Sequence, residues 1–243
     1  MSPPPPGKIL VLGLPRTGTT SLCWQFLQLG YRVAHTAFTR DACSRAQVLA
    51  DSPVFADYAE LTPLLQPSHW LYLERPLAEW LPSMQTLLDK MRRVPAGRLQ
   101  PLTERSFTRV FGNWRQGLTE VELAESYRQH RQRVTRLAEQ WSLPLVKLTL
   151  VTATEAPSSQ PADLDLATAL SQVNAELRPL RLDCQLNSGR VNAWAELHHR
   201  NKVAPHFAGA HGRRYFDYRV EAGSIGATAA NMRASAPRLD CAN

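Results

Sequence analysis

The chain has 243 residues, 44% of them hydrophobic and 20% charged, so it can bury a sizeable core within a single domain. Its four scattered cysteines lack C-x-x-C spacing, which argues against a zinc site or a disulfide framework and favours a reduced, cytoplasmic protein. The net charge of +7 suits an anionic ligand, but no run of basic residues indicates nucleic-acid binding.

The N-terminal segment, residues 1–7, is rich in proline, and we expect it to be disordered. The apolar stretch that follows it is too short for a membrane span. We expect one α/β domain over residues 8–220. Residues 221–243, rich in Ala, Gly and Ser, are predicted to form a flexible tail.

A glycine-containing loop, GLPRTGTTS over residues 13–21, links an apolar strand predicted over residues 8–12 to a helix predicted over residues 19–29. Its two glycines let backbone N–H groups curl around one anion at the positive end of the helix. Thr19 stands where a nucleoside triphosphatase has lysine, and the cation within the loop is Arg16. The loop residues predicted to bind an oxyanion are Pro15, Arg16, Thr17, Gly18, Thr19, Thr20 and Ser21.

Three further strands are predicted over residues 31–35, 54–57 and 69–74, each ending near a polar residue. The alternation of strands and helices predicts a three-layer α/β fold with a mostly parallel, P-loop-like sheet. Ligands of such sheets sit beyond the carboxyl ends of the strands. We therefore expect four side chains to face one crevice: Arg16, His35, Asp57 and Arg75.

A second candidate binding motif begins where the strand over residues 69–74 ends at Arg75. Ser83 follows eight positions later, within a predicted helix. An arginine leaving a strand and a hydroxyl two turns into the next helix can converge on one phosphate. Pro82 removes a backbone hydrogen bond from this helix, and we expect it to bend the helix there.

The second half of the domain is predicted to be mainly helical. Residues 92–117 carry aromatic residues on one helical face, which either cover a bound substrate as a lid or pack on the core. A capping box at Thr119 predicts a long helix, whose apolar stripe includes His130 as a packed residue. The last core strand is expected over residues 145–150, and a short helix over residues 166–177.

The loop over residues 13–21 resembles the 5′-phosphosulfate loop of the sulfotransferases, which use 3′-phosphoadenosine 5′-phosphosulfate (PAPS). Arg75 and Ser83 are similar to the pair that binds the 3′-phosphate in that family. The tripeptide over residues 190–192 resembles a segment of a bacterial branch. The resemblance also implies that a late basic loop, with Arg213 or Arg214, completes the 3′-phosphate site.

The resemblance implies transfer of a sulfuryl group from PAPS, without a metal, to a hydroxyl or amine. Arg16 and the N–H groups of the loop would stabilise charge on the departing oxygen. No motif identifies the acceptor, which we expect to be a small molecule or a carbohydrate, with a lipid or a peptide tyrosine as alternatives.

The acceptor requires a base, and three residues compete for this role: Asp57, His35 and His69. We rank Asp57 first because it ends the strand predicted over residues 54–57, and because an aspartate recurs there in the bacterial branch. Asp57 can instead cap the helix that follows. His69 is expected at the far end of its strand.

Two other classes of function are open. A nucleotide or small-molecule kinase with an altered P-loop would need magnesium ligands and a lysine where this chain has Thr19. A non-catalytic module that binds a nucleotide or nucleic acid would not need Arg16, Arg75 and Ser83 together. The sulfotransferase hypothesis explains all three residues.

Overall fold

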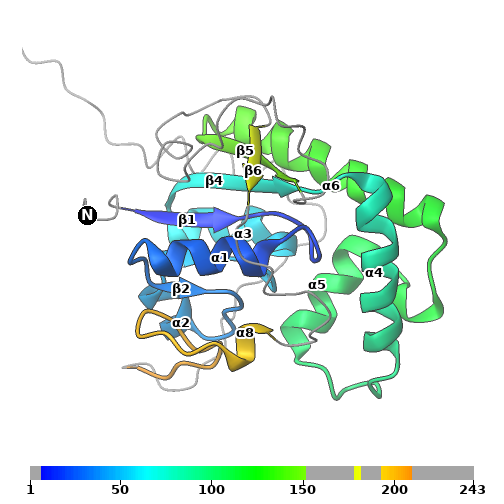
Figure 1. Ribbon diagram of the computed structural model, residues 1–243, viewed down its shortest axis with the longest axis horizontal. Helices are drawn as coiled ribbons and strands as arrows, with labels where there is room; N and C mark the ends of the chain where they lie inside the picture. The colour runs from blue at the N-terminus through cyan, green and yellow to red at the C-terminus, as the bar shows by residue number, and fades with distance from the viewer. Residues whose placement is uncertain (1–6, 152–177, 182–192, 210–243) are drawn as a thin grey trace, which may run out of the picture.

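The computed structural model describes residues 7–151, 178–181 and 193–209. Its centre is a six-stranded sheet of order β2-β3-β1-β4-β5-β6, in which every pairing is parallel, with helices around it (Figure 1). The predicted α/β fold class is therefore confirmed. The strands are β1 (Lys8–Val11), β2 (Val33–Ala34), β3 (Val48–Leu49), β4 (Pro67–Glu74), β5 (Leu145–Val151) and β6 (Arg178–Arg181).

Helices connect these strands, and the first and the longest of them match the sequence prediction. The capping box is formed, because the hydroxyl of Thr119 accepts from the backbone of Glu122 and the Glu122 carboxylate accepts from the backbone of Thr119. The described helices are α1 (Thr19–Gln28), α2 (Arg40–Arg45), α3 (Val54–Leu65), α4 (Leu77–Arg92), α5 (Pro101–Phe111), the 3-10 turn η1 (Trp114–Gln116), α6 (Glu120–Gln140) and α8 (Ala193–Glu196).

The prediction of a strand over residues 54–57 is wrong, because helix α3 begins with these residues. A strand that was not predicted, β3, lies beside β1 on the side away from β4, and its Val48 pairs with Ile9. A short apolar run fits a buried helix turn as well as a strand. Phe55 packs edge-on against Phe107 of α5, and this contact places the run in a helical layer. β5 is also not the last strand, since β6 pairs with it.

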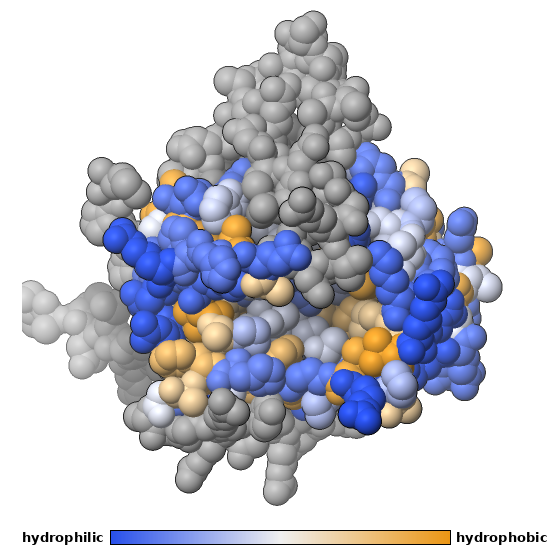
Figure 2. Space-filling model, turned by 60° about the horizontal axis from the view of Figure 1, so that its bottom comes forward, coloured by the Kyte–Doolittle hydropathy of each residue, from blue (hydrophilic) through white to orange (hydrophobic). Residues whose placement is uncertain are grey.

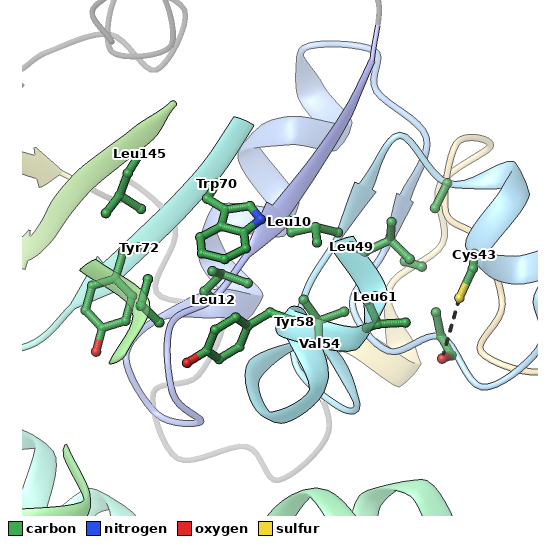
Figure 3. Packing of buried hydrophobic residues seen from close by; sticks show 14 of the residues in the cluster. Leu10, Leu12, Cys43, Leu49, Val54, Tyr58, Leu61, Trp70, Tyr72 and Leu145 are labelled. Atoms are coloured by element: carbon green, nitrogen blue, oxygen red, sulfur yellow. Dashed lines mark hydrogen bonds between the residues drawn. The ribbon is translucent and has the colours of Figure 1, made fainter. Parts of the chain in front are cut away.

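Two hydrophobic cores lie on opposite faces of the sheet. Ile9 and Val11 of β1 join the core that contains Phe26 of α1. Leu10 and Leu12, the latter being the residue after the strand, belong to the core formed with α3 and α6 (Figure 3). Burial on both faces is typical of a central parallel strand. This burial on both faces holds β1 in the sheet, and so it fixes the position at which the glycine-containing loop begins.

A third core joins α4, α5 and α6 beside the sheet. The aromatic residues Phe107, Phe111 and Trp114 are buried there, together with Trp80 of α4. Of the two readings of residues 92–117, packing on the core accounts for these aromatic side chains. Helix α4 continues through Pro82 to Arg92, so the proline does not end the helix.

Several sequence predictions fall outside the described residues. These are the tails over residues 1–6 and 221–243, the helix over residues 166–177, the tripeptide over residues 190–192, and the basic residues Arg213 and Arg214. Among the helices of residues 7–151 and 193–209, none combines the length and apolar composition that a membrane crossing requires.

Candidate active site

The glycine-containing loop leaves the carboxyl end of β1 and leads into α1. A side chain at Gly13 would place its Cβ 2.7 Å from Oγ1 of Thr17 and 2.8 Å from the carbonyl oxygen of Leu73, so only glycine fits this approach of the loop to β4. Gly18 has a left-handed backbone (φ 101°) and precedes α1, where no side chain caps the helix. The N-terminus of a helix without a side-chain cap is a place where backbone N–H groups can hold an anion.

Arg16, Ser83 and Arg75 come together beside this loop. The Nε atom of Arg16 donates to the hydroxyl of Ser83 at 2.9 Å, and Arg75 reaches the backbone oxygen of Arg16 at 3.5 Å. Burial and the nearby Arg75 guanidinium lower the pKa of Arg16, while Asp51 raises it. Two like charges in a partly buried place favour binding of an anion that both can contact.

Two aromatic residues that the sequence analysis did not single out hold this cluster in place. The indole N–H of Trp80 in α4 donates to the carbonyl oxygen of Pro15 at 2.8 Å. The hydroxyl of Tyr127 in α6 donates to the carbonyl oxygen of Arg75 at 2.8 Å and accepts from its backbone N–H at 3.2 Å. These residues position the loop and the end of β4 through the backbone. In the sequence they look like ordinary members of apolar helix faces.

His35 follows β2 and contacts the loop directly. Its Nε2 atom lies 3.1 Å from the hydroxyl of Thr20 and 3.3 Å from that of Thr19. Burial lowers the pKa of His35, Asp51 raises it, and Lys202 lowers it further. A neutral imidazole at the end of an anion-binding loop can accept a proton from a group that approaches the anion.

Asp51 is a site residue that the sequence analysis missed. It follows β3, with one carboxylate oxygen accepting from the N–H of Ser52 at 2.6 Å and the other 3.7 Å from Nε2 of His35. The signal was present in the sequence, because the apolar run over residues 48–50 ends at this aspartate. The same reasoning was applied instead to the run that ends at Asp57.

Asp57 does not lie at a strand end, which corrects the prediction that made it face the crevice from a strand. It lies within α3, at a residue with non-helical backbone (φ −111°, ψ 19°), and its side chain is fully buried. The carboxylate pairs with Arg105 and, at 3.0 Å, with Arg109 of α5. α3 is kinked at Asp57, with a helical segment on either side, so the alternative that Asp57 caps the segment that follows it stays a prediction. The ion pairs make it a link between α3 and α5.

The other histidines that were considered lie elsewhere. His69 is paired with Ile9 near the start of β1, away from the loop at the other end of that strand. His130 is buried, with Nε2 2.7 Å from the carbonyl oxygen of Phe55, and burial lowers its pKa to about 4. The prediction that His130 is a packed residue is confirmed.

The molecular surface is hollowed in the view of Figure 2, with apolar patches on either side of the hollow and hydrophilic side chains along its borders. The carboxyl ends of β1 and β4 point toward α4 and α5 (Figure 1). No group of three or more His, Cys, Asp and Glu side chains in the described ranges could hold a metal ion. The chain is thus an α/β protein whose glycine-containing loop carries Arg16 and has Thr19 in the position of a P-loop lysine.

The family model of the sulfotransferase domain matches residues 8–42 and 37–149. The matched segments make up more than half of the chain and contain the loop, both arginines and Ser83, so the chain belongs to the sulfotransferase domain family. Membership makes it a transferase with sulfuryl transfer as its general activity. No curated protein matches the chain in sequence.

Proposed function

We propose that the protein transfers a sulfuryl group from PAPS to a hydroxyl or amine of a small molecule or carbohydrate. The observation that carries this proposal is the convergence of Arg16, Arg75 and Ser83 at a loop that has Thr19 in place of lysine. A nucleotide with phosphate groups at both its 5′ and 3′ positions would satisfy both guanidinium groups.

The residues present fit such a cosubstrate. Arg16 and the N–H groups at the start of α1 would hold the 5′ end, and Arg75 with Ser83 would hold the 3′-phosphate. PAPS supplies an activated sulfuryl group when it is bound. Arg16 lies in the loop itself, and it would stabilise negative charge that develops at the bound anion.

The base we propose is His35, in place of Asp57. Its Nε2 atom faces the loop hydroxyls, and the lowered pKa of His35 keeps the imidazole neutral and ready to accept the proton of the acceptor. Asp51, 3.7 Å from this nitrogen, would then stabilise the imidazolium. Asp57 is the weaker candidate, because protonation would disrupt its pairing with two guanidinium groups.

Calorimetric titration with three ligands separates this function from the two alternatives. The protein is expected to bind 3′-phosphoadenosine 5′-phosphate (PAP), the nucleotide product, in the micromolar range typical of cosubstrate sites and without added metal. ATP with magnesium tests the kinase, and a single-stranded oligonucleotide tests the nucleic-acid module. Tighter binding of ATP that requires magnesium, or of the oligonucleotide, would overturn the proposal.

A further inference from the structure

A late segment of the chain returns to the edge of the sheet beside His35. Val33 of β2 donates to the backbone oxygen of Asn201 at 3.0 Å and accepts from the N–H of Val203 at 2.8 Å, so residues 201–203 run along β2. His35 lies two positions after Val33. This pairing brings α8, which precedes the segment, next to the imidazole.

Trp194 of α8 is the residue that covers His35. Its side chain is buried, and the ring centroids of Trp194 and His35 are 5.3 Å apart, with an angle of 32° between the ring planes. The indole N–H is buried and has no hydrogen-bond partner within the described part of the structure. The ring is therefore held by packing and by the backbone that carries it, not by a hydrogen bond of its own.

Lys202 holds that backbone. Its ammonium group donates to the carbonyl oxygens of Trp194 at 2.5 Å, Leu197 at 2.8 Å and Ala195 at 3.2 Å. The same ammonium lies 5.4 Å from the centre of the Trp194 ring. A helix as short as α8 is not stable alone, and the carbonyl groups at its end need partners from outside the helix.

We infer that Lys202 is a positioning residue of the active site, whose ammonium group fixes the end of α8 and so keeps the indole of Trp194 packed on the imidazole of His35. The contacts between Lys202, Trp194 and His35 do not depend on the proposed function. The role of His35 as base does rest on it. Lys202 itself touches neither the loop hydroxyls nor the arginine cluster in any contact described above.

The charges around His35 determine what loss of Lys202 does. The groups that face the imidazole are Asp51 after β3, Lys202 beside α8, and the neutral hydroxyls of Thr19 and Thr20. Removing the ammonium takes away a positive charge, and a displaced Trp194 admits water to the imidazole. Both changes favour the protonated form, so both raise the pKa of His35.

The test compares Lys202→Met with Lys202→Arg and with the control Lys90→Met, an exposed lysine on α4. NMR titration of the imidazole measures the pKa of His35. Labelling with 5-fluorotryptophan measures exposure of Trp194, through the change of its fluorine resonance between H2O and D2O. Trp194→Leu identifies that resonance.

Lys202→Met is expected to raise the pKa of His35 by roughly one unit and to expose the indole to solvent. Lys202→Arg should preserve most of both properties, and Lys90→Met all of them. If Lys202→Met moves neither quantity more than the control does, the inference is overturned. A raised pKa with an unexposed indole also overturns it, because the ammonium would then act by charge alone.

Trp194→Leu keeps the test decisive if Lys202→Met does not fold. With Lys202 intact, loss of the ring should raise the pKa of His35, and an unchanged pKa would contradict the inference. PAP affinity of Lys202→Met should stay within about twofold of wild type, since the arginine cluster is untouched. Failure of wild-type protein to bind PAP would overturn the proposed function but leave the His35 measurements intact.

Discussion

Arg16 and Arg75 carry the same charge but occupy different positions around one site. Arg16 has a left-handed backbone (φ 73°) within the loop. Arg75 leaves β4, and its Nε atom pairs with Glu79 at 3.1 Å. In the proposed function, the first would contact the reacting end of the nucleotide, whereas the second would contact a phosphate that does not react. Their losses should therefore have different kinetic consequences.

Arg16→Ala should lower kcat about 100-fold with a smaller effect on PAP affinity, because it removes stabilisation of charge that develops during transfer. Arg75→Ala should instead weaken PAP binding about 10-fold or more, with kcat less affected at saturation. Steady-state kinetics and calorimetry measure the two quantities, with exposed Arg98→Ala as the control. Equal losses of kcat and affinity in both variants would contradict the assigned roles.

The base can be tested at His35, Asp51 and Asp57 side by side. His35→Gln should reduce kcat about 100-fold while PAP binding changes little, because only the proton acceptor is removed. Asp51→Asn should reduce kcat less, since it acts through the imidazole. The assignment to His35 fails if His35→Gln keeps near-normal turnover, and Asp51 would then be the base.

Asp57→Asn should act on stability more than on chemistry. It leaves two arginines of α5 without their buried partner, and should lower the free energy of unfolding by about 2 kcal/mol. This is below the roughly 3–5 kcal/mol of fully buried pairs, because Arg105 and Arg109 keep some access to water. Urea denaturation measures the change, with the more exposed Asp89→Asn as control. Unchanged stability with lost turnover would restore Asp57 as the base.

Helix α6 fastens the α3 layer to the sheet through His130. Its imidazole contacts the carbonyl oxygen of Phe55 and, at 3.3 Å, the hydroxyl of Tyr72. Burial lowers the pKa of His130 to about 4, below its value of about 6.5 in the unfolded chain. The unfolded state therefore takes up a proton at a higher pH than the folded state does.

This difference predicts that the contribution of neutral His130 to the free energy of unfolding is fully present above about pH 6.5 and is lost as the pH falls toward about 4. Between pH 7 and pH 5, His130 should contribute a loss of about 2 kcal/mol in the free energy of unfolding. Urea denaturation at both values, on wild type and His130→Gln, measures the contribution, with exposed His198→Gln as control. An identical pH dependence in His130→Gln would contradict it.

Elements with strong local signals were predictable from the sequence. β1 and β4 are apolar runs followed by turn signals, and α1 and α6 begin at a glycine and at a capping box. A strand was predicted at the start of α3 while β3 was missed, and this error has a physical cause. Two apolar runs, over residues 48–50 and 54–56, both end at an aspartate, and only tertiary packing decides which of them joins the sheet.

The site as a whole is assembled from the carboxyl ends of four neighbouring strands, β2, β3, β1 and β4. Arg16, His35 and Arg75 were predictable, since ligands of such sheets sit beyond the carboxyl ends of the strands. Asp51 was missed, because the strand that carries it was predicted elsewhere. The residues that hold the site in place were not predictable. Trp80, Tyr127 and Trp194 reach it from helices far away in the sequence, through contacts to backbone or to an imidazole that local patterns do not encode.

The proposed function requires that one nucleotide spans both the loop and the pair Arg75 and Ser83. The most direct measurement is calorimetry of PAP against 5′-AMP, which differ by the 3′-phosphate, in wild type, Arg75→Ala and Ser83→Ala. Wild type should prefer PAP by about 10-fold or more, Arg75→Ala should lose most of that preference, and Ser83→Ala part of it, with 5′-AMP affinity little changed. Equal affinity of wild type for both nucleotides, or an unchanged preference in Arg75→Ala, would contradict the claim.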